Sequence, residues 1–261
     1  MDQVSERLRI AVWNVLFQVF LSNTNAVNGR VKAIVDELRW DQAEFWAGGS
    51  GRLVDRLKVE FLTSAQSWDF YDTLDAVARG LSGLHATGET DYWAMWNKPL
   101  IEERAAFRFV SGQLVPLTNE AEIAEVECAL RSPLQSVREH IETALGKLAE
   151  RPTPDVRNAI KESISAVEAA LKVTTGRSQG DLAKALPDFE TKFGELHPAF
   201  RMGIEKLYAY TNDEKGLRHS LLEAGAKVDG DDAQFMLIAC SALSNFLIAR
   251  ASTKGWKALK G

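Results

Sequence analysis

Apolar residues recur every three or four positions along most of the chain, a spacing that is typical of amphipathic helices. The clearest example runs from Asp155 to Thr174, and Gly176 follows it, as a glycine often does where a helix ends. The apolar stripe of this segment consists of Val156, Ile160, Ile164, Val167 and Leu171. The pattern therefore predicts a helix over 155–174 and a fold that is mostly all-α.

The same spacing predicts further helices on both sides of this one. They are expected at 5–21, 26–40, 52–62, 68–84, 93–107, 134–150, 181–186, 198–210 and 232–250. Gly48–Gly51 is expected to break the chain between two of them. The inward-facing residues of the 198–210 helix are expected to be Phe200, Ile204, Leu207 and Tyr208. The 232–250 helix is apolar on nearly every side, so we expect it at the centre of a helical bundle.

One segment departs from the helical period. Across residues 107–117, alternating apolar residues flank Ser111-Gly112, which predicts a short β-hairpin. Thr118 is then expected to cap a new helix. We place the domain boundary here, with 1–120 as a helical N-terminal domain that contains the hairpin and 121–261 as a helical bundle.

Bulk composition argues against some classes of function. The chain has 261 residues, which is enough for two ordinary domains or one large one. Its net charge of -5 argues against a broad surface that coats nucleic acid, but it does not exclude a small phosphate pocket. The apolar run from Ile10 to Leu21 is too short to span a bilayer and lacks the features of a signal peptide. We therefore expect a cytoplasmic protein with no membrane partner.

Cofactor and metal motifs are not found in the sequence. There is no P-loop, no dinucleotide-binding glycine pattern and no Gly-x-Ser-x-Gly elbow. The two cysteines, Cys128 and Cys240, and the four histidines are too widely spaced for a metal site. We therefore expect no cofactor and no metal, and we expect both cysteines to be buried free thiols.

The strongest candidate for chemistry is the adjacent pair Arg218 and His219, which follows a turn at the start of an expected helix. Arginine holds phosphate through bidentate hydrogen bonds, and histidine transfers protons near neutral pH. Together they have the chemistry for RNA cleavage without a metal. Because neighbouring helical residues point about 100° apart, two copies in a dimer would build one site more easily. The alternative is structural, with Arg218 paired to Asp213 or Glu214 and His219 capping a helix.

Several polar residues are candidates for a supporting or RNA-binding role. Asn212 and Asp213 lie in the turn before the pair, where they either cap the helix or orient His219. On the 155–174 helix, Asn158 and Glu162 belong either to a solvated face or to a polar seam. In that seam, Glu162 would orient His219 or Arg218, and Lys161 would add positive charge for phosphate. His140 and His197 are interpreted as structural.

Four segments of the C-terminal half resemble a bacterial HEPN-like domain of the kind found in AbiJ-type abortive-infection proteins. They are Arg157–Glu168, Lys206–Asp213, Gly216–His219 and Phe235–Ala242. The N-terminal segments Ser5-Glu-Arg-Leu8 and Val12-Trp-Asn14 are similar to the AbiJ N-terminal domains that precede HEPN modules. The resemblance covers most of the chain.

This resemblance implies an all-helical bundle that forms a homodimer and acts as a metal-independent endoribonuclease in antiphage abortive infection. Its partner would be RNA, cleaved by transesterification to leave a 2′,3′-cyclic end. The N-terminal domain would sense a phage-derived trigger or regulate the bundle. A toxin held by a separate antitoxin is a third possibility.

The sequence departs from the family pattern at the catalytic motif. HEPN nucleases have an Arg separated from the following His by four to six residues, but the corresponding positions before His219, 212–214, hold Asn, Asp and Glu. Arg79 and His85 have a matching spacing, yet they lie in the N-terminal part. The departure favours an alternative in which the HEPN-like domain is catalytically silent. It would then be a binding or dimerisation module that senses a phage or nucleotide signal.

Overall fold

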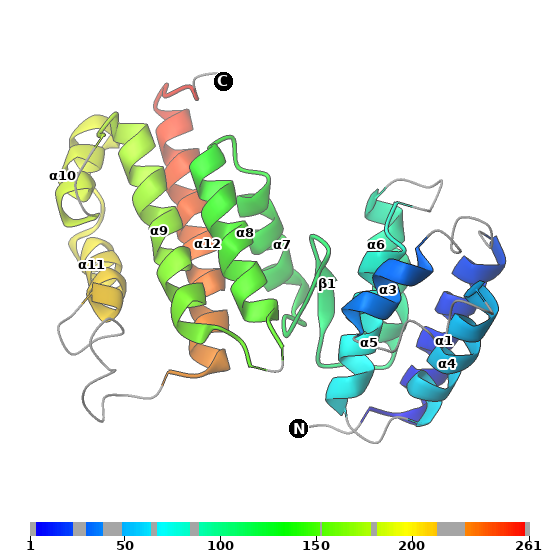
Figure 1. Cartoon of the computed structure of the whole chain (residues 1–261). Coiled ribbons are helices and arrows are strands. Elements are labelled where there is room, and N and C mark those ends of the chain that lie inside the picture. The colour runs from blue at the N-terminus through cyan, green and yellow to red at the C-terminus, as the bar shows by residue number, and fades with distance from the viewer. Residues whose placement is uncertain are drawn as a thin grey trace. The chain divides into compact units, whose positions relative to one another are not determined.

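The structure, a computed structural model, describes residues 4–22, 30–38, 49–63, 67–83, 89–151, 153–178, 182–212 and 228–258 (Figure 1). These residues form eleven α-helices and one antiparallel two-stranded hairpin, which confirms the prediction of a mostly all-α fold. The chain divides into two compact units, Met1–Thr118 (unit 1) and Asn119–Gly261 (unit 2).

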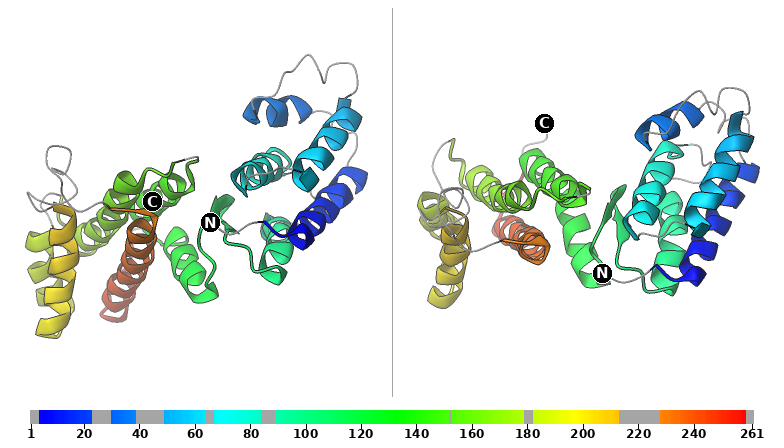
Figure 2. Two further views of the ribbon diagram at one scale, coloured as in Figure 1. Left: turned by 90° about the horizontal axis from the view of Figure 1, so that it is seen from below. Right: turned by 60° about the horizontal axis from the view of Figure 1, so that its bottom comes forward.

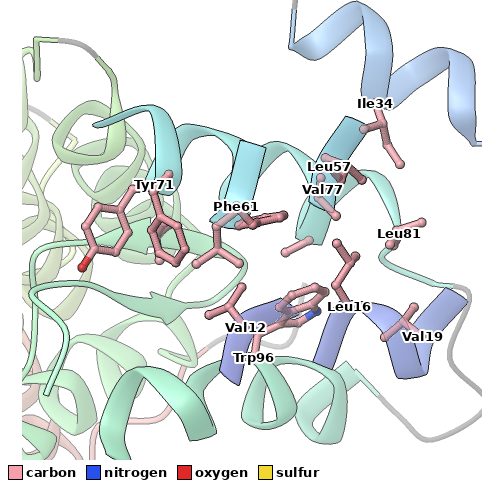
Figure 3. Packing of buried hydrophobic residues seen from close by; sticks show 14 of the residues in the cluster. Val12, Leu16, Val19, Ile34, Leu57, Phe61, Tyr71, Val77, Leu81 and Trp96 are labelled. Atoms are coloured by element: carbon pink, nitrogen blue, oxygen red, sulfur yellow. The ribbon is translucent and has the colours of Figure 1, made fainter. Parts of the chain in front are cut away.

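Unit 1 is a set of helices around one apolar core. Its described helices are α1 (Glu6–Ser22), α3 (Val31–Glu37), α4 (Gly49–Thr63), α5 (Ser67–Gly80) and α6 (Glu89–Glu102). Val12 and Leu16 of α1 are fully buried with Phe61 of α4 and Trp96 of α6 (Figure 3). Phe61 meets the edge of Phe70 at 5.5 Å between ring centres. Every helix therefore contributes its apolar stripe to the same core.

The predicted hairpin is confirmed and is attached to α6. Strands β1 (Arg108–Val110) and β2 (Gln113–Val115) pair in antiparallel register. Ser111 and Gly112 have φ angles of 48° and 80°. Positive φ at both central residues is what a two-residue type I′ hairpin turn requires. The side-chain amide of Asn97 in α6 forms two hydrogen bonds with β1. Its Nδ2 donates to the Phe109 carbonyl and its Oδ1 accepts from the Phe109 N–H, both at 2.8 Å.

Unit 2 is a helical bundle built around α9. Its helices are α7 (Glu120–Leu130), α8 (Gln135–Ala149), α9 (Val156–Thr175), α10 (Leu182–Phe193), α11 (Pro198–Asn212) and α12 (Gly230–Thr253). Helix α9 packs between α8 and α12, and α10 and α11 lie along its remaining side (Figures 1 and 2). Asp155 caps the start of α9, and Gly176 ends it with φ of 74°. The helix predicted over 155–174 is thus confirmed.

Several helix boundaries differ from the sequence prediction. Helix α4 begins at Gly49, so the break expected at Gly48–Gly51 is wrong for its described part. A glycine destabilises a helix by only about 0.5–1 kcal/mol. Burying Leu53 and Leu57 stabilises the fold by more than that. Helix α10 likewise continues through Pro187 to bury two phenylalanines beyond it.

Two further boundaries depend on local backbone geometry. Helix α6 spans Glu89–Glu102, so it begins before Trp93 and ends well before Phe107. Beyond its end, Arg104 has φ of 51°, which is incompatible with a continuing α-helix. Asn119 caps α7 in place of Thr118, because its side chain accepts hydrogen bonds from two backbone N–H groups of the first turn.

The exposure of some apolar residues also differs from expectation. Ile204 is buried as predicted, but Phe200 on α11 is 45% exposed. Helix α12 buries one side in unit 2, yet it leaves Phe235 and Phe246 exposed on the other. Cys128 is exposed, whereas Cys240 is buried, and burial raises the pKa of the Cys240 thiol to about 12.

Helix α12 is also long and apolar enough to cross a membrane by length and composition alone. Half of its most apolar window is buried among the other helices of unit 2, as in a core helix. The described part of the chain contains no other helix that meets the same criteria.

The central position of α9 predicts a large difference between two of its neighbouring residues. Leu171 is fully buried, whereas Val173 is 43% exposed. Leu171→Ala should lower the free energy of unfolding by about 2–5 kcal/mol, because it removes buried surface and leaves a cavity. Val173→Ala should change it by less than about 0.5 kcal/mol. Urea unfolding followed by circular dichroism measures both, and equal losses would contradict the proposed packing.

Candidate functional site

The predicted catalytic pair lies outside the described residues. Arg218, His219 and Asp213 all fall in the interval 213–227, which the structure does not describe. Asn212 is the last residue of α11, and its side chain is also outside the description. The described residues that bear on the site are those that flank this interval and the predicted supporting residues on α9.

The two flanks of this interval lie next to each other. Tyr210, near the end of α11, interacts with Asp232 in the first turn of α12. Partial burial, followed by the negative charge and hydrogen bond of Asp232 and the charge of Asp229, raises the pKa of the Tyr210 hydroxyl. The chain thus leaves α11 and enters α12 at neighbouring points of unit 2, as the bottom of Figure 1 shows.

The start of α12 is fixed by a reciprocal cap. The Asp229 carboxylate accepts hydrogen bonds from the N–H groups of Asp231 and Asp232 at 3.0 and 3.2 Å. In return, the Asp232 carboxylate accepts from the Asp229 N–H at 3.0 Å. Three carboxylates therefore stand beside the interval that contains Arg218, and their charge favours a cation there.

Glu162 pairs with a histidine from the adjacent helix. The Nδ1 atom of His140 on α8 lies 2.7 Å from Oε2 of Glu162 on α9. The side chains are 37% and 21% exposed, so the pair lies at the edge of the bundle rather than in its core. The pair therefore joins α8 to α9.

Asn158 is occupied by the cap of α9. Its side-chain amide donates to Oδ2 of Asp155 at 2.7 Å, and its backbone N–H donates to Oδ1 at 3.3 Å. The side-chain bond from Asn158 is the main reason why the pKa of Asp155 is lowered, and Lys147 adds a smaller effect in the same direction. Lys161 is exposed on the same helix.

The structure brings the predicted residues together only in part. Asn158, Lys161 and Glu162 all lie in the first half of α9, whose start is at the same end of unit 2 as the end of α11 and the start of α12 (Figure 1). Glu162 and Asn158 each have another partner in this region, His140 and Asp155 respectively.

The histidine partner of Glu162 was missed by sequence reasoning, although the chain contains a signal for it. Helices α8 and α9 form a hairpin with a short connection, and Lys147 approaches Asp155 at 3.8 Å beside it. Two helical turns from that contact along each antiparallel helix, positions 140 and 162 face each other. The register of the hairpin would therefore have paired His140 with Glu162.

Neither the spacing match of Arg79 and His85 nor a metal site adds to the candidate site in the described residues. Arg79 forms an ion pair with Asp75 at 2.9 Å, and His85, which has the matching spacing, lies outside the described residues. Within the described ranges, no three His, Cys, Asp or Glu side chains form a group suited to a metal ion.

Comparison with known proteins gives one match. The sequence model of a protein family described as AbiJ N-terminal domain 4 matches residues 1–132. The match includes unit 1 and continues through α7 of unit 2. No curated protein and no solved structure matches the chain significantly.

The cap of α9 predicts a measurable change at Asp155. Asn158→Ala should raise the pKa of Asp155 toward its ordinary value, because it removes the largest cause of the lowered value. A carboxyl group whose pKa is lowered in the folded state stabilises the fold at pH values above its ordinary pKa. That stability is lost as the pH falls through the folded-state pKa. The variant should therefore lose less stability on acidification. Carboxyl NMR titration measures the pKa, with Lys161→Ala as the control, and an unchanged Asp155 in Asn158→Ala would contradict the assignment.

Proposed function

The chain belongs to the AbiJ N-terminal domain 4 family, and from this membership we propose that it is an antiphage abortive-infection effector whose unit 2 cleaves RNA without a metal. The family match over residues 1–132 is the observation that carries the role in abortive infection. The nuclease activity is supported by the Arg218-His219 pair and by the resemblance of the C-terminal half to an HEPN-like domain.

The proposed reaction is a transesterification at phosphorus. His219 removes the proton from the 2′-hydroxyl as the 2′-oxygen bonds to phosphorus. Arg218 stabilises the added negative charge of the phosphorane through its guanidinium group. The bond from phosphorus to the 5′-oxygen then breaks, and that oxygen receives a proton from the protonated His219. The products are a 2′,3′-cyclic phosphate and a free 5′-hydroxyl.

The described residues suggest how this site is supported. Tyr210 and Asp232 lie close enough to interact, so the two ends of the chain on either side of Arg218 and His219 are near each other. Lys161 is exposed on α9 and is assigned to phosphate binding. Because Asn158 and Glu162 are engaged by Asp155 and His140, we assign them to positioning α9 rather than to direct contact with RNA.

The proposed partners follow from this activity. The substrate is RNA, and the protein acts in the cytoplasm as a homodimer formed by the HEPN-like unit. The N-terminal domain receives a phage-derived trigger, or a separate antitoxin restrains the chain. Asn212 and Asp213 complete the proposed site by orienting His219.

A silent binding module is the second candidate. It is favoured by the sequence at 212–214, which lacks the Arg that HEPN nucleases place before the His. The three carboxylates at the start of α12 also favour pairing with Arg218 over the approach of a phosphate. In this case the HEPN-like unit senses a phage or nucleotide signal without cleaving RNA.

The nuclease proposal is tested with labelled tRNAs and single-stranded RNAs in EDTA. The wild type should cleave, and His219→Ala should lose about 100-fold or more of the rate, because general acid–base catalysis contributes at least that much. His140→Ala is the matched control, since His140 is a partly exposed histidine of the same unit that pairs with Glu162. It should retain cleavage within a few-fold of the wild type.

The remaining outcomes separate the two candidates. No cleavage by the wild type, together with binding of a nucleotide or phage component, supports the silent module. Cleavage that persists in His219→Ala but disappears in His140→Ala moves the site to the pair of His140 and Glu162. Cleavage that EDTA abolishes contradicts the metal-free reaction.

A further inference from the structure

Arg108 of unit 1 is a buried cation whose hydrogen-bond partners carry no charge. It lies on β1 and is only 6% exposed. Its Nη1 donates to the carbonyls of Ala105 and Phe107 at 2.8 and 2.7 Å. Among the residues that the structure describes, no carboxylate forms an ion pair with it, and burial is the main reason why its pKa is lowered. Because a buried charge normally has a partner of opposite charge, this position favours an anion that is not part of the chain.

Part of the Arg108 guanidinium group is still available to a ligand. The two bonds to backbone carbonyls use Nη1 alone. Within the described part of the chain, Nε and Nη2 have no acceptor, and neither nitrogen is fully enclosed. These two nitrogens form the edge of the guanidinium group that can bind two oxygens of one anion in parallel.

Arg9 approaches the same part of unit 1 from α1. Its guanidinium carbon lies 5.4 Å from the centre of the Phe70 ring, and its Nη1 donates to the Phe61 carbonyl at 2.9 Å. Burial lowers the pKa of Arg9, and the phenolic oxygen of Tyr71 opposes that effect, as it does for Arg108. Tyr71 is therefore close enough to interact with both cations.

A row of aromatic rings connects the two arginines. The Phe70 ring beneath Arg9 packs edge to face with Tyr71 at 5.2 Å between ring centres, and Tyr71 packs on Phe107 at 4.5 Å. The Phe107 carbonyl is in turn an acceptor for Arg108. The Tyr71 hydroxyl group points away from the buried cluster of unit 1 (Figure 3). Rigid rings therefore hold the two guanidinium groups close to one hydroxyl group before any ligand binds.

The charge of this group favours a phosphate over a carboxylate. Arg9 and Arg108 supply two positive charges, whereas a carboxylate carries only one negative charge. A phosphate monoester carries up to about two negative charges and offers three oxygens that accept strong hydrogen bonds. The planar donors of arginine also match two phosphate oxygens at once, which a lysine ammonium group does not.

We propose that unit 1 binds a small phosphate-bearing anion between Arg9 and Arg108, with the Tyr71 hydroxyl group as a third contact. This inference goes beyond the proposed function, because it concerns described residues of unit 1 and holds whether or not unit 2 cleaves RNA. The bound anion would connect α1 to β1, so it would stabilise unit 1 in proportion to its affinity.

Isothermal titration calorimetry on the full chain tests the site with inorganic phosphate, adenosine monophosphate and adenosine. The wild type should bind the two phosphate compounds but not adenosine, which carries no anion. Arg9→Gln and Arg108→Lys should each raise the dissociation constant at least about tenfold, because each removes charge-assisted hydrogen bonds of a guanidinium group. Arg7→Gln is the matched control, since Arg7 is an exposed arginine of the same helix as Arg9, and it should change the constant by less than about twofold.

The affinities of the probes identify what the site recognises. Equal affinities for the two phosphate compounds would identify phosphate as the whole ligand, and tighter binding of the nucleotide would identify a nucleoside phosphate. No binding of either compound by the wild type would overturn the proposal, as would equally tight binding of succinate. Circular dichroism checks that each variant is folded. If Arg108→Lys does not fold, Arg9→Gln decides, and unchanged binding in that variant would overturn the site.

Arg218→Gln distinguishes this site from the proposed cleavage site. Because Arg218 is proposed to hold the phosphate of RNA, an anion bound there would be lost in this variant. We expect Arg218→Gln to bind phosphate as the wild type does, whereas Arg9→Gln binds it weakly. The reverse result would overturn the site in unit 1 and place the anion beside Arg218. A wild type that binds phosphate but cleaves no RNA would contradict the nuclease proposal alone.

Discussion

The burial of α9 is the constraint on which unit 2 depends. Eleven of its twenty residues are buried, because α8, α12 and α10 all pack against it. Its buried hydroxyl groups donate hydrogen bonds to carbonyls of the preceding turn. Ser163 donates to the Ala159 carbonyl, and Thr174 donates to the Ala170 carbonyl. A helix used in this way has only a narrow side left for polar residues, and that side contains Asn158, Lys161 and Glu162.

The polar residues on this narrow side connect the candidate site to the helices of unit 2. Glu162 joins α9 to α8 through His140, whereas Asn158 bonds to Asp155 within the cap of α9 itself. A pair near the surface contributes little to stability by itself, and the register of the α8–α9 hairpin follows from the packing of the two helices' buried residues. A well-defined register gives the neighbouring end of unit 2 a rigid base, which a phosphate-binding site requires for its geometry.

Helix α12 is apolar on nearly every side, but only one of its sides is buried. The side with Leu237 and Cys240 is buried, and the side with Phe235 and Phe246 is exposed. A sequence that is apolar all round is usual for a helix buried on every side. Among the described residues of unit 2, the ring of Phe200 on α11 packs against Phe246, and Phe235 stays exposed.

Local signals in the sequence determined the helices and the hairpin. The period of Val156 to Leu171 predicts α9, and Ser111-Gly112 predicts the turn of the hairpin, because both depend on residues close together in the chain. The family resemblance also came from sequence alone, and its N-terminal part agrees with the match over residues 1–132.

Tertiary structure decided the features that depend on distant residues. Helix α4 includes its glycines and α10 passes through Pro187 because buried neighbours outweigh local propensity. Only the packing of α8 on α9 brings His140 to Glu162, since the two residues lie twenty-two positions apart. The sequence by itself determined which residues can form helices and carry chemistry. The tertiary structure decided which of those residues meet and which apolar side remains uncovered, because both depend on how the helices share one core.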